Sequence, residues 1–180
     1  MRIVPCPSMT KGDNGRRYFD IGTVVAKEIE RKFLLSTDTW RELATHKVEI
    51  RDGLLAFRDG RKIRVRFCDD KATLSVKGPK KGLTRDEFEY EIPARDGLAL
   101  LEDHCDGTIL KKTRYFIPHG GYVWTVDEFQ GVHTGLVLAE IELPSEDAEF
   151  EKPTWLGREV SGKSQYRQSS LFKKHRQATK

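Results

Sequence analysis

Charged side chains recur at every second position along several segments of this chain, which is the spacing of a β-strand. Alternate residues of a strand point to the same face of a sheet. Arg64 and Arg66 alternate with apolar residues in this way, and so do Glu140 and Glu142. In any one strand, the pattern is also that of a sheet with one face in water. Glutamate and lysine are depleted in strands, however, so their repeated use on one parity indicates a specialised charged surface.

The charges that share a face form one candidate set with equal numbers of bases and acids. The bases are Lys32, Arg64, Arg66, Lys77, Arg85, Lys112 and Arg114, and the acids are Glu28, Glu30, Glu87, Glu89, Asp127, Glu140 and Glu142. Glu91, Lys111 and Glu128 are expected to face solvent, and Glu87 and Glu89 either belong to the site or only orient its bases.

The chain has the pattern of successive antiparallel hairpins with a few helices. Strands are expected at residues 25–35, 48–57, 62–68, 72–77, 84–92, 108–117, 122–129 and 136–143. Turns are expected at residues 58–61 and at Gly120-Gly121. Helices are expected at residues 36–46, 93–104, 145–151 and 163–174. Eight antiparallel strands can close into a barrel that holds one small ligand, so we predict an α+β fold: a closed eight-stranded antiparallel β-barrel with peripheral helices.

The length of 180 residues fits one main domain. Residues 1–24 are rich in proline and glycine and are expected to form a flexible extension, so the barrel domain is expected over residues 25–180, including the helix at 163–174. The last eighteen residues carry six bases and no acid, which accounts for the net charge of +4. The helix at 163–174 is expected either to act as a lid or to pack on the barrel through Tyr166, Leu171 and Phe172.

Several classes of protein are excluded or disfavoured. No run of about 18 apolar residues is present, so a membrane span is not expected. The N-terminal segment lacks the apolar stretch of a secretory signal. Cys6, Cys68 and Cys105 are odd in number and show no CxxC spacing, which is consistent with a reducing cytoplasm. A nucleic-acid groove would explain the seven bases but not the seven acids, which would repel a phosphate backbone.

Charges of both signs inside a closed barrel call for a ligand that needs both. Enclosing so many charges is costly unless they pair with one another or bind ions. Arginine and lysine coordinate phosphate oxygens, whereas carboxylates hold Mg²⁺ or Mn²⁺. The residues therefore favour a small molecule with several linked phosphates, bound together with a divalent cation.

At this point the sequence resembles a known family. The segment Glu28-Ile29-Glu30-Arg31-Lys32 resembles the ExExK signature of the CYTH superfamily, the triphosphate tunnel metalloenzymes. The ordered segments that follow it are also similar to this family: those around Arg64 and Arg66, Lys77, Arg85 to Glu89, Lys112 and Arg114, Asp127, and Glu140 and Glu142. Residues 155–167 resemble the C-terminal segment of the short bacterial tripolyphosphatases, which this chain resembles most. One departure is Asp52-Gly53-Leu54-Leu55, where relatives commonly have Gln-Gly-Tyr-Leu, and no role is assigned to Asp52.

The resemblance implies a divalent-metal-dependent triphosphatase that converts inorganic tripolyphosphate to pyrophosphate and phosphate. The metal, Mg²⁺ or Mn²⁺, would be held by Glu28, Glu30, Glu140 and Glu142, with Asp127 holding a second ion or placing the attacking water. The phosphates would be bound by Lys32, Arg64, Arg66, Lys77, Arg85, Lys112 and Arg114. Lys32, Lys77, Lys112 and Asp127 are the candidate catalytic residues, and the general base is either a metal-activated water or a lysine of lowered pKa.

Other functions stay open at this stage. Within the family, the chain could be an adenylate cyclase that acts on ATP, or a thiamine triphosphatase. Outside it, the alternatives are a non-catalytic module that binds polyphosphate or nucleotides and a purely structural charged barrel. A homodimer is compatible with the sequence, but no residue pattern specifies one.

Overall fold

The computed structural model describes residues 27–173, so the predicted extension at residues 1–24 lies outside the described residues. Within this part of the chain, the strands are β1 (Lys27–Leu35), β2 (His46–Arg58), β3 (Arg61–Cys68), β4 (Lys71–Lys77), β5 (Thr84–Ile92), β6 (Leu110–His119), β7 (Tyr122–Phe129), β8 (Val137–Glu142) and β9 (Leu156–Glu159). The α-helices are α1 (Trp40–Leu43), α2 (Ala94–Asp103) and α3 (Gln168–Lys173), and the 3₁₀ turns are η1 (Gly131–His133) and η2 (Ser164–Tyr166).

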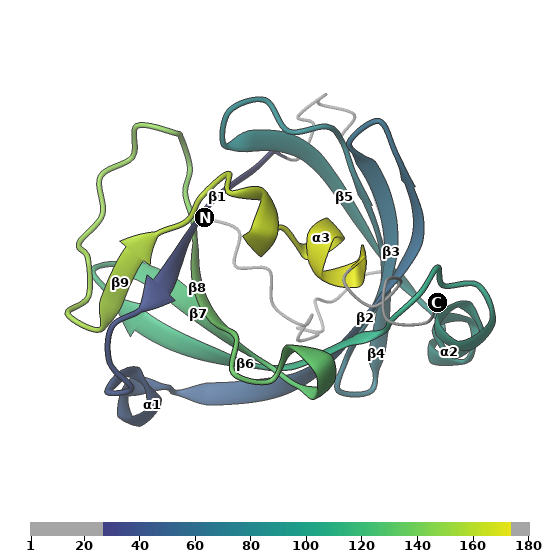
Figure 1. The fold of residues 1–180 in the computed structure, drawn as a ribbon, viewed down its shortest axis with the longest axis horizontal. Coiled ribbons are helices and arrows are strands. Elements are labelled where there is room, and N and C mark those ends of the chain that lie inside the picture. Colours follow the sequence, from purple (N-terminus) through teal and green to yellow (C-terminus); the bar gives the residue numbers. More distant parts are fainter. Residues whose placement is uncertain (1–26, 174–180) are drawn as a thin grey trace, which may run out of the picture.

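Eight strands form a closed antiparallel barrel, which confirms the predicted fold class. The strand order is β5-β4-β3-β2-β6-β7-β8-β1, and pairing of β1 with β5 closes the ring, as Figure 1 shows in a view along the opening. Glu28 of β1 is paired with Arg85 of β5, and Lys32 is paired with Glu140 of β8. The register itself therefore sets opposite charges side by side. The ninth strand, β9, extends the sheet along the edge of β1 beyond its contact with β5.

The turns between strands agree with the sequence pattern. Asp59 and Gly60 join β2 to β3 with φ angles of 51° and 78°, and Gly120 and Gly121 join β6 to β7 with φ angles of 57° and 78°. Two successive residues of positive φ suit the right-handed twist of a tight hairpin, and aspartate and glycine tolerate this conformation.

Apolar residues of the opposite parity pack in layers on the outside of the barrel. One layer contains Phe33, Trp40, Trp124, Ile141 and Trp155. Another lies between α2 and strands β3 and β4, where Val65, Phe67 and Ala72 contact Leu101. Gly97 of α2 is needed for this contact, because a Cβ there would come within 2.5 Å of the Ala72 side chain.

A third apolar cluster lies inside the barrel and is completed by the C-terminal segment. Leu54, Leu110, Phe129 and Leu138 have the same parity as the charged inward residues of their strands, and they contact Val160, Leu171 and Phe172. In Figure 1, α3 lies within the ring of strands. The C-terminal segment therefore fills part of the interior with apolar side chains and leaves the rest to charged ones.

Three predicted helices differ from the structure, while the helix predicted at 93–104 is confirmed as α2. The helix expected at 36–46 is only the four residues of α1. The helix expected at 163–174 starts at Gln168, because Lys163 and Arg167 have extended backbones with ψ angles of 124° and 133°.

The segment expected to form a helix at 145–151 contains no helix. Its Glu146 carboxylate accepts hydrogen bonds from the Leu83 amide and the Thr84 hydroxyl, and Phe150 packs edge-on against Trp124. These tertiary contacts keep the segment in a non-helical conformation, although its local sequence favours a helix. No helix in the described part of the chain is both long and apolar enough to span a membrane.

Candidate active site

The barrel encloses a cavity of about 470 Å³ that is lined mostly by charged side chains. Eleven of the twelve predicted site residues line it: Glu28, Glu30, Lys32, Arg64, Arg66, Lys77, Arg85, Lys112, Arg114, Glu140 and Glu142. They come from six of the eight barrel strands, since alternation turns every second residue inward. The twelfth, Asp127, lies behind this surface and is completely buried.

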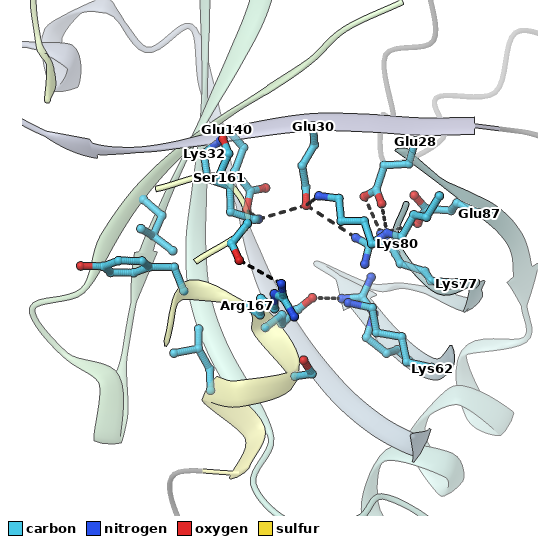
Figure 2. A pocket seen from close by; sticks show the side chains of 18 of the residues that line it. Glu28, Glu30, Lys32, Lys62, Lys77, Lys80, Glu87, Glu140, Ser161 and Arg167 are labelled. Atoms are coloured by element: carbon cyan, nitrogen blue, oxygen red, sulfur yellow. Dashed lines mark hydrogen bonds and ion pairs between the residues drawn. The ribbon is translucent and has the colours of Figure 1, made fainter. Parts of the chain in front are cut away.

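Glu28 is the centre of one group of ion pairs. Its carboxylate accepts a hydrogen bond of 2.7 Å from Lys77 Nζ and another from Arg85 Nε, and Figure 2 shows these bases directed at it. Burial alone would raise the pKa of Glu28, but Lys77 and Arg85 hold it well below its usual value. Lys77 also lies 2.6 Å from Glu87, so this acid, whose role the sequence left open, contacts a base of the site.

Glu30 lies between bases from three elements. Its Oε1 is 3.4 Å from Lys32, 3.6 Å from Arg85 and 3.7 Å from Lys80. Burial opposes ionisation, yet Lys32 and the neighbouring bases lower the pKa of Glu30 to about 2. Its carboxylate is therefore ionised at neutral pH.

The pKa of Glu142 is raised, whereas the pKa of Glu30, its pairing partner across the sheet, is lowered. Burial, together with repulsion from Glu28 and Glu30, raises its pKa to about 7. Three carboxylates thus lie close enough to affect one another, and a positive charge among them would relieve their repulsion.

Asp127 lies in a second group of ion pairs, between Lys112 and Arg114. It accepts hydrogen bonds of 2.5 Å from Lys112 and of 2.6 and 2.7 Å from Arg114. Arg114 also donates a 2.9 Å hydrogen bond to Glu140, which in turn pairs with Lys32. Burial lowers the pKa of Lys112 to about 8, despite the nearby Asp127. The structure therefore places Asp127 where it orients two cavity bases.

Asp52 orients Arg64 and Arg66 in the same way. The sequence interpretation had assigned no role to this residue. It is completely buried, and its Oδ1 lies 2.9 Å from Arg66 Nε and 3.3 Å from Arg64. Burial would raise its pKa, but the two guanidinium groups and Lys112 lower it far below the usual value. Parity could have found this residue, because Asp52 faces Arg66 across the β2–β3 hairpin.

Two lysines outside the predicted site residues also line the cavity, together with part of the C-terminal segment. Lys62 has the same parity as Arg64 and Arg66, so strand alternation contained the signal that was overlooked. Lys80 comes from the loop between β4 and β5. Arg167 and Gln168 reach the cavity because the chain folds back into the barrel after β9.

Comparison with known proteins agrees with this geometry. The model of the family described as CYTH domain matches residues 26–176. The chain belongs to the CYTH domain family.

Curated relatives of this CYTH domain carry a common name. This chain is 46% identical to a protein of Acetivibrio thermocellus named inorganic triphosphatase, over 83% of this chain and 95% of the relative. It is 35% identical to a protein of the same name from Nitrosomonas europaea, over 80% of this chain and 95% of the relative. A crystal structure of an inorganic triphosphatase aligns with a TM-score of 0.58 at 32% identity, over 81% of this chain and 93% of that one.

The carboxylates of this CYTH domain have the chemistry of a divalent-metal site. Triphosphatases of the family generally use such an ion. Among residues 27–173, no three His, Cys, Asp or Glu side chains are grouped closely enough to hold a metal ion as they stand. Glu28, Glu30 and Glu140 each contact a base instead. The donors are nevertheless hard oxygens, and the repulsion that raises the pKa of Glu142 is what a divalent cation would remove. The residues present therefore fit a divalent cation.

Proposed function

We propose that this protein hydrolyses inorganic tripolyphosphate to pyrophosphate and phosphate with the help of Mg²⁺ or Mn²⁺. The observation that carries the proposal is the charge of the enclosed cavity. Among the described residues that line it, eleven are basic and six are acidic. Such a lining suits a small polyanion bound with a cation, and the name shared by the curated relatives supports a triphosphate as that anion.

The bases of the cavity would bind the phosphate oxygens. Arg64, Arg66, Arg85 and Arg114 offer planar donors that bind two oxygens at once, and Lys32, Lys77 and Lys112 supply point charges. Asp52 and Asp127 hold four of these bases in place before substrate arrives. Preorganised charge of this kind stabilises a phosphoryl-transfer transition state without reorganisation during the reaction.

Glu28, Glu30, Glu140 and Glu142 would hold the metal. When bound, the ion would neutralise charge on the phosphate oxygens and make water more acidic. The contacts of Asp127 favour a role in orienting Lys112 and Arg114, and its assignment to a second ion or to the attacking water stays a prediction.

Lys112 is the lysine best suited to exchange a proton in this site. With a pKa of about 8, it is partly neutral near neutral pH, and its Nζ is fixed by Asp127. Lys32 differs, because Glu140 and Glu30 outweigh its burial and raise its pKa, so it remains a cation. We therefore assign Lys112 as the candidate proton acceptor and Lys32 as an electrostatic contact. Lys77, which Glu28 and Glu87 hold, remains a candidate for either role.

A substrate panel tests the proposal. Purified protein is incubated with tripolyphosphate, thiamine triphosphate and ATP, each with Mg²⁺ and with Mn²⁺, and released phosphate and cyclic AMP are measured. We expect the highest kcat/KM on tripolyphosphate and no product in EDTA. Cyclic AMP from ATP would instead identify an adenylate cyclase, and preferred turnover of thiamine triphosphate would identify a thiamine triphosphatase. Binding of tripolyphosphate without turnover under either metal would identify a non-catalytic binding module.

We also propose that the protein acts in the cytoplasm, as its unpaired pattern of cysteines suggested. A homodimer stays a prediction, which sedimentation of the purified protein would test.

A further inference from the structure

The loop between β4 and β5 forms part of the rim of the cavity. Three of its residues, Pro79, Lys80 and Gly82, line the cavity. The side chain of Lys80 is 24% exposed, and its Nζ lies 3.7 Å from Glu30 (Figure 2). Burial lowers the pKa of Lys80, although Glu30 opposes this. The loop therefore supplies the cavity with a base from outside the barrel strands.

The tip of this loop is a tight turn held by the backbone. Lys81 and Thr84 exchange two hydrogen bonds of 2.8 and 3.0 Å, which fold Gly82 and Leu83 into the turn. Gly82 has a φ angle of 61°, a conformation that glycine adopts without strain. These hydrogen bonds lie within the loop itself, so they do not fix where its tip lies against the rest of the rim.

Glu146 connects the tip of the loop to a different part of the barrel. Its Oε1 accepts a 2.9 Å hydrogen bond from the Leu83 amide and a 2.6 Å hydrogen bond from the Thr84 hydroxyl. These two donors, the hydroxyl first, lower the pKa of Glu146, so its carboxylate is ionised at neutral pH. A Cβ on Gly82 would lie 2.9 Å from the same oxygen. The turn therefore packs directly against this carboxylate.

The segment that carries Glu146 is itself anchored on the barrel. It covers residues 143–155, between β8 and β9, and its Phe150 packs edge-on against Trp124. In the barrel, β1 lies between β8 and β5. Glu146 thus reaches past β1 from the β8 side and holds the loop that precedes β5.

We propose that Glu146 is a positioning residue of the active site, which holds the β4–β5 loop at the rim so that Lys80 points into the cavity. The inference rests on the proposed function, in which the cavity bases contact the substrate phosphates. Glu146 is exposed and is not among the described residues that line the cavity, so it acts through the loop. A loop released from Glu146 would weaken substrate binding and change kcat little, because Lys80 contacts the substrate before and during the reaction alike.

The first test measures hydrolysis of tripolyphosphate by the full-length protein with Mg²⁺. Glu146→Ala should raise KM about three- to tenfold, the scale of one lost hydrogen bond, and should leave kcat within about twofold. Glu146→Gln keeps an oxygen that accepts both hydrogen bonds, so its KM should stay near that of the wild type. The matched control is Asp147→Ala, because this neighbouring exposed acid bonds Ser145 in its own segment. Its KM should not change.

A double variant tests whether Glu146 acts through Lys80. Lys80→Met should raise KM by itself, and adding Glu146→Ala to it should raise KM no further. Independent effects would multiply instead, because changes at uncoupled sites add in free energy. Multiplied effects, or an unchanged KM in Glu146→Ala, would overturn the positioning role.

Limited digestion with trypsin tests the position of the loop without substrate. Cleavage after Lys80 or Lys81, mapped by mass spectrometry, should be several-fold faster in Glu146→Ala than in the wild type and in Asp147→Ala, because a released loop opens more often. Equal rates would overturn the inference. A wild type that does not hydrolyse tripolyphosphate would contradict the proposed function, whereas the digestion would still decide whether Glu146 holds the loop.

Discussion

Gln168 of the C-terminal helix donates a 2.7 Å hydrogen bond from Nε2 to Asp52, a completely buried carboxylate on β2. The same glutamine accepts a hydrogen bond from Arg64 through Oε1. A residue near the end of the chain thus completes the group that orients Arg64 and Arg66. The predicted helix at 163–174 was expected to be either a lid or a packing element. The structure combines a packing role, through Leu171 and Phe172, with a contact to the charged site through Gln168.

Replacing Asp52 with alanine should strongly destabilise the protein. The change would leave Arg64 and Arg66 buried without their carboxylate, and removing one partner of a buried ion pair typically costs about 3–5 kcal/mol. Urea denaturation measures the free energy of unfolding. As a control, Asp86→Ala removes the exposed ion pair with Lys27 and should cost no more than about 1 kcal/mol. Similar losses in both variants would contradict the structural role of Asp52.

The two functions of the C-terminal segment should separate in two variants. Leu171→Ala removes a buried side chain from the apolar cluster inside the barrel and should lower the free energy of unfolding by about 2–5 kcal/mol. Gln168→Ala should change stability much less but raise KM for tripolyphosphate, because Arg64 and Asp52 lose a partner beside the cavity. Thermal melts and steady-state kinetics on both variants distinguish the effects. An unchanged KM in Gln168→Ala would leave the segment with a packing role only.

Replacing Glu28 or Glu140 with glutamine should abolish metal-dependent turnover. Both side chains line the cavity, and each loses the charge that a divalent cation needs while keeping its shape. We expect kcat to fall by at least about 10²-fold, with weaker binding of Mn²⁺ in calorimetry. Glu128→Gln is the matched control, because Glu128 lies on β7 with the outward parity and pairs with Arg41. Full activity in the Glu28 and Glu140 variants would remove the metal assignment.

Lys62→Met should make the free protein more stable, to an extent that depends on pH. Folding lowers the pKa of Lys62, so the unfolded chain binds more protons than the native state between the lowered pKa and the unfolded value of about 10.4. The penalty of this lysine is complete below the lowered pKa and disappears as the pH rises toward the unfolded value. Denaturation at a series of pH values from 6 to 10 measures the free energy of unfolding of both proteins. The extra stability of the variant should become smaller as the pH rises. A constant difference across this range would contradict the assigned environment of Lys62.

Much of the fold and of the candidate site follows from strand alternation. Arg64, Arg66, Glu140 and Glu142 were placed on one face from their spacing alone, and the structure turns all four into the cavity. The same rule applied to Lys62 and Asp52 would have added both residues. The C-terminal contacts were beyond this rule, since Gln168 meets Asp52 across 116 positions in the chain.

The sequence by itself determined which residues share a face, because parity along an extended backbone is a local property. The spacing of the strands along the chain also predicted the closed antiparallel barrel, since eight antiparallel strands can close around one small ligand. Only the tertiary structure decided how those charges pair. Asp127 forms ion pairs with Lys112 and Arg114, and Glu28 forms ion pairs with Lys77 and Arg85. Lys62 has no carboxylate partner in the described part of the chain. Strand register and the return of the C-terminal segment fix these distances, and neither is encoded in any short stretch of residues.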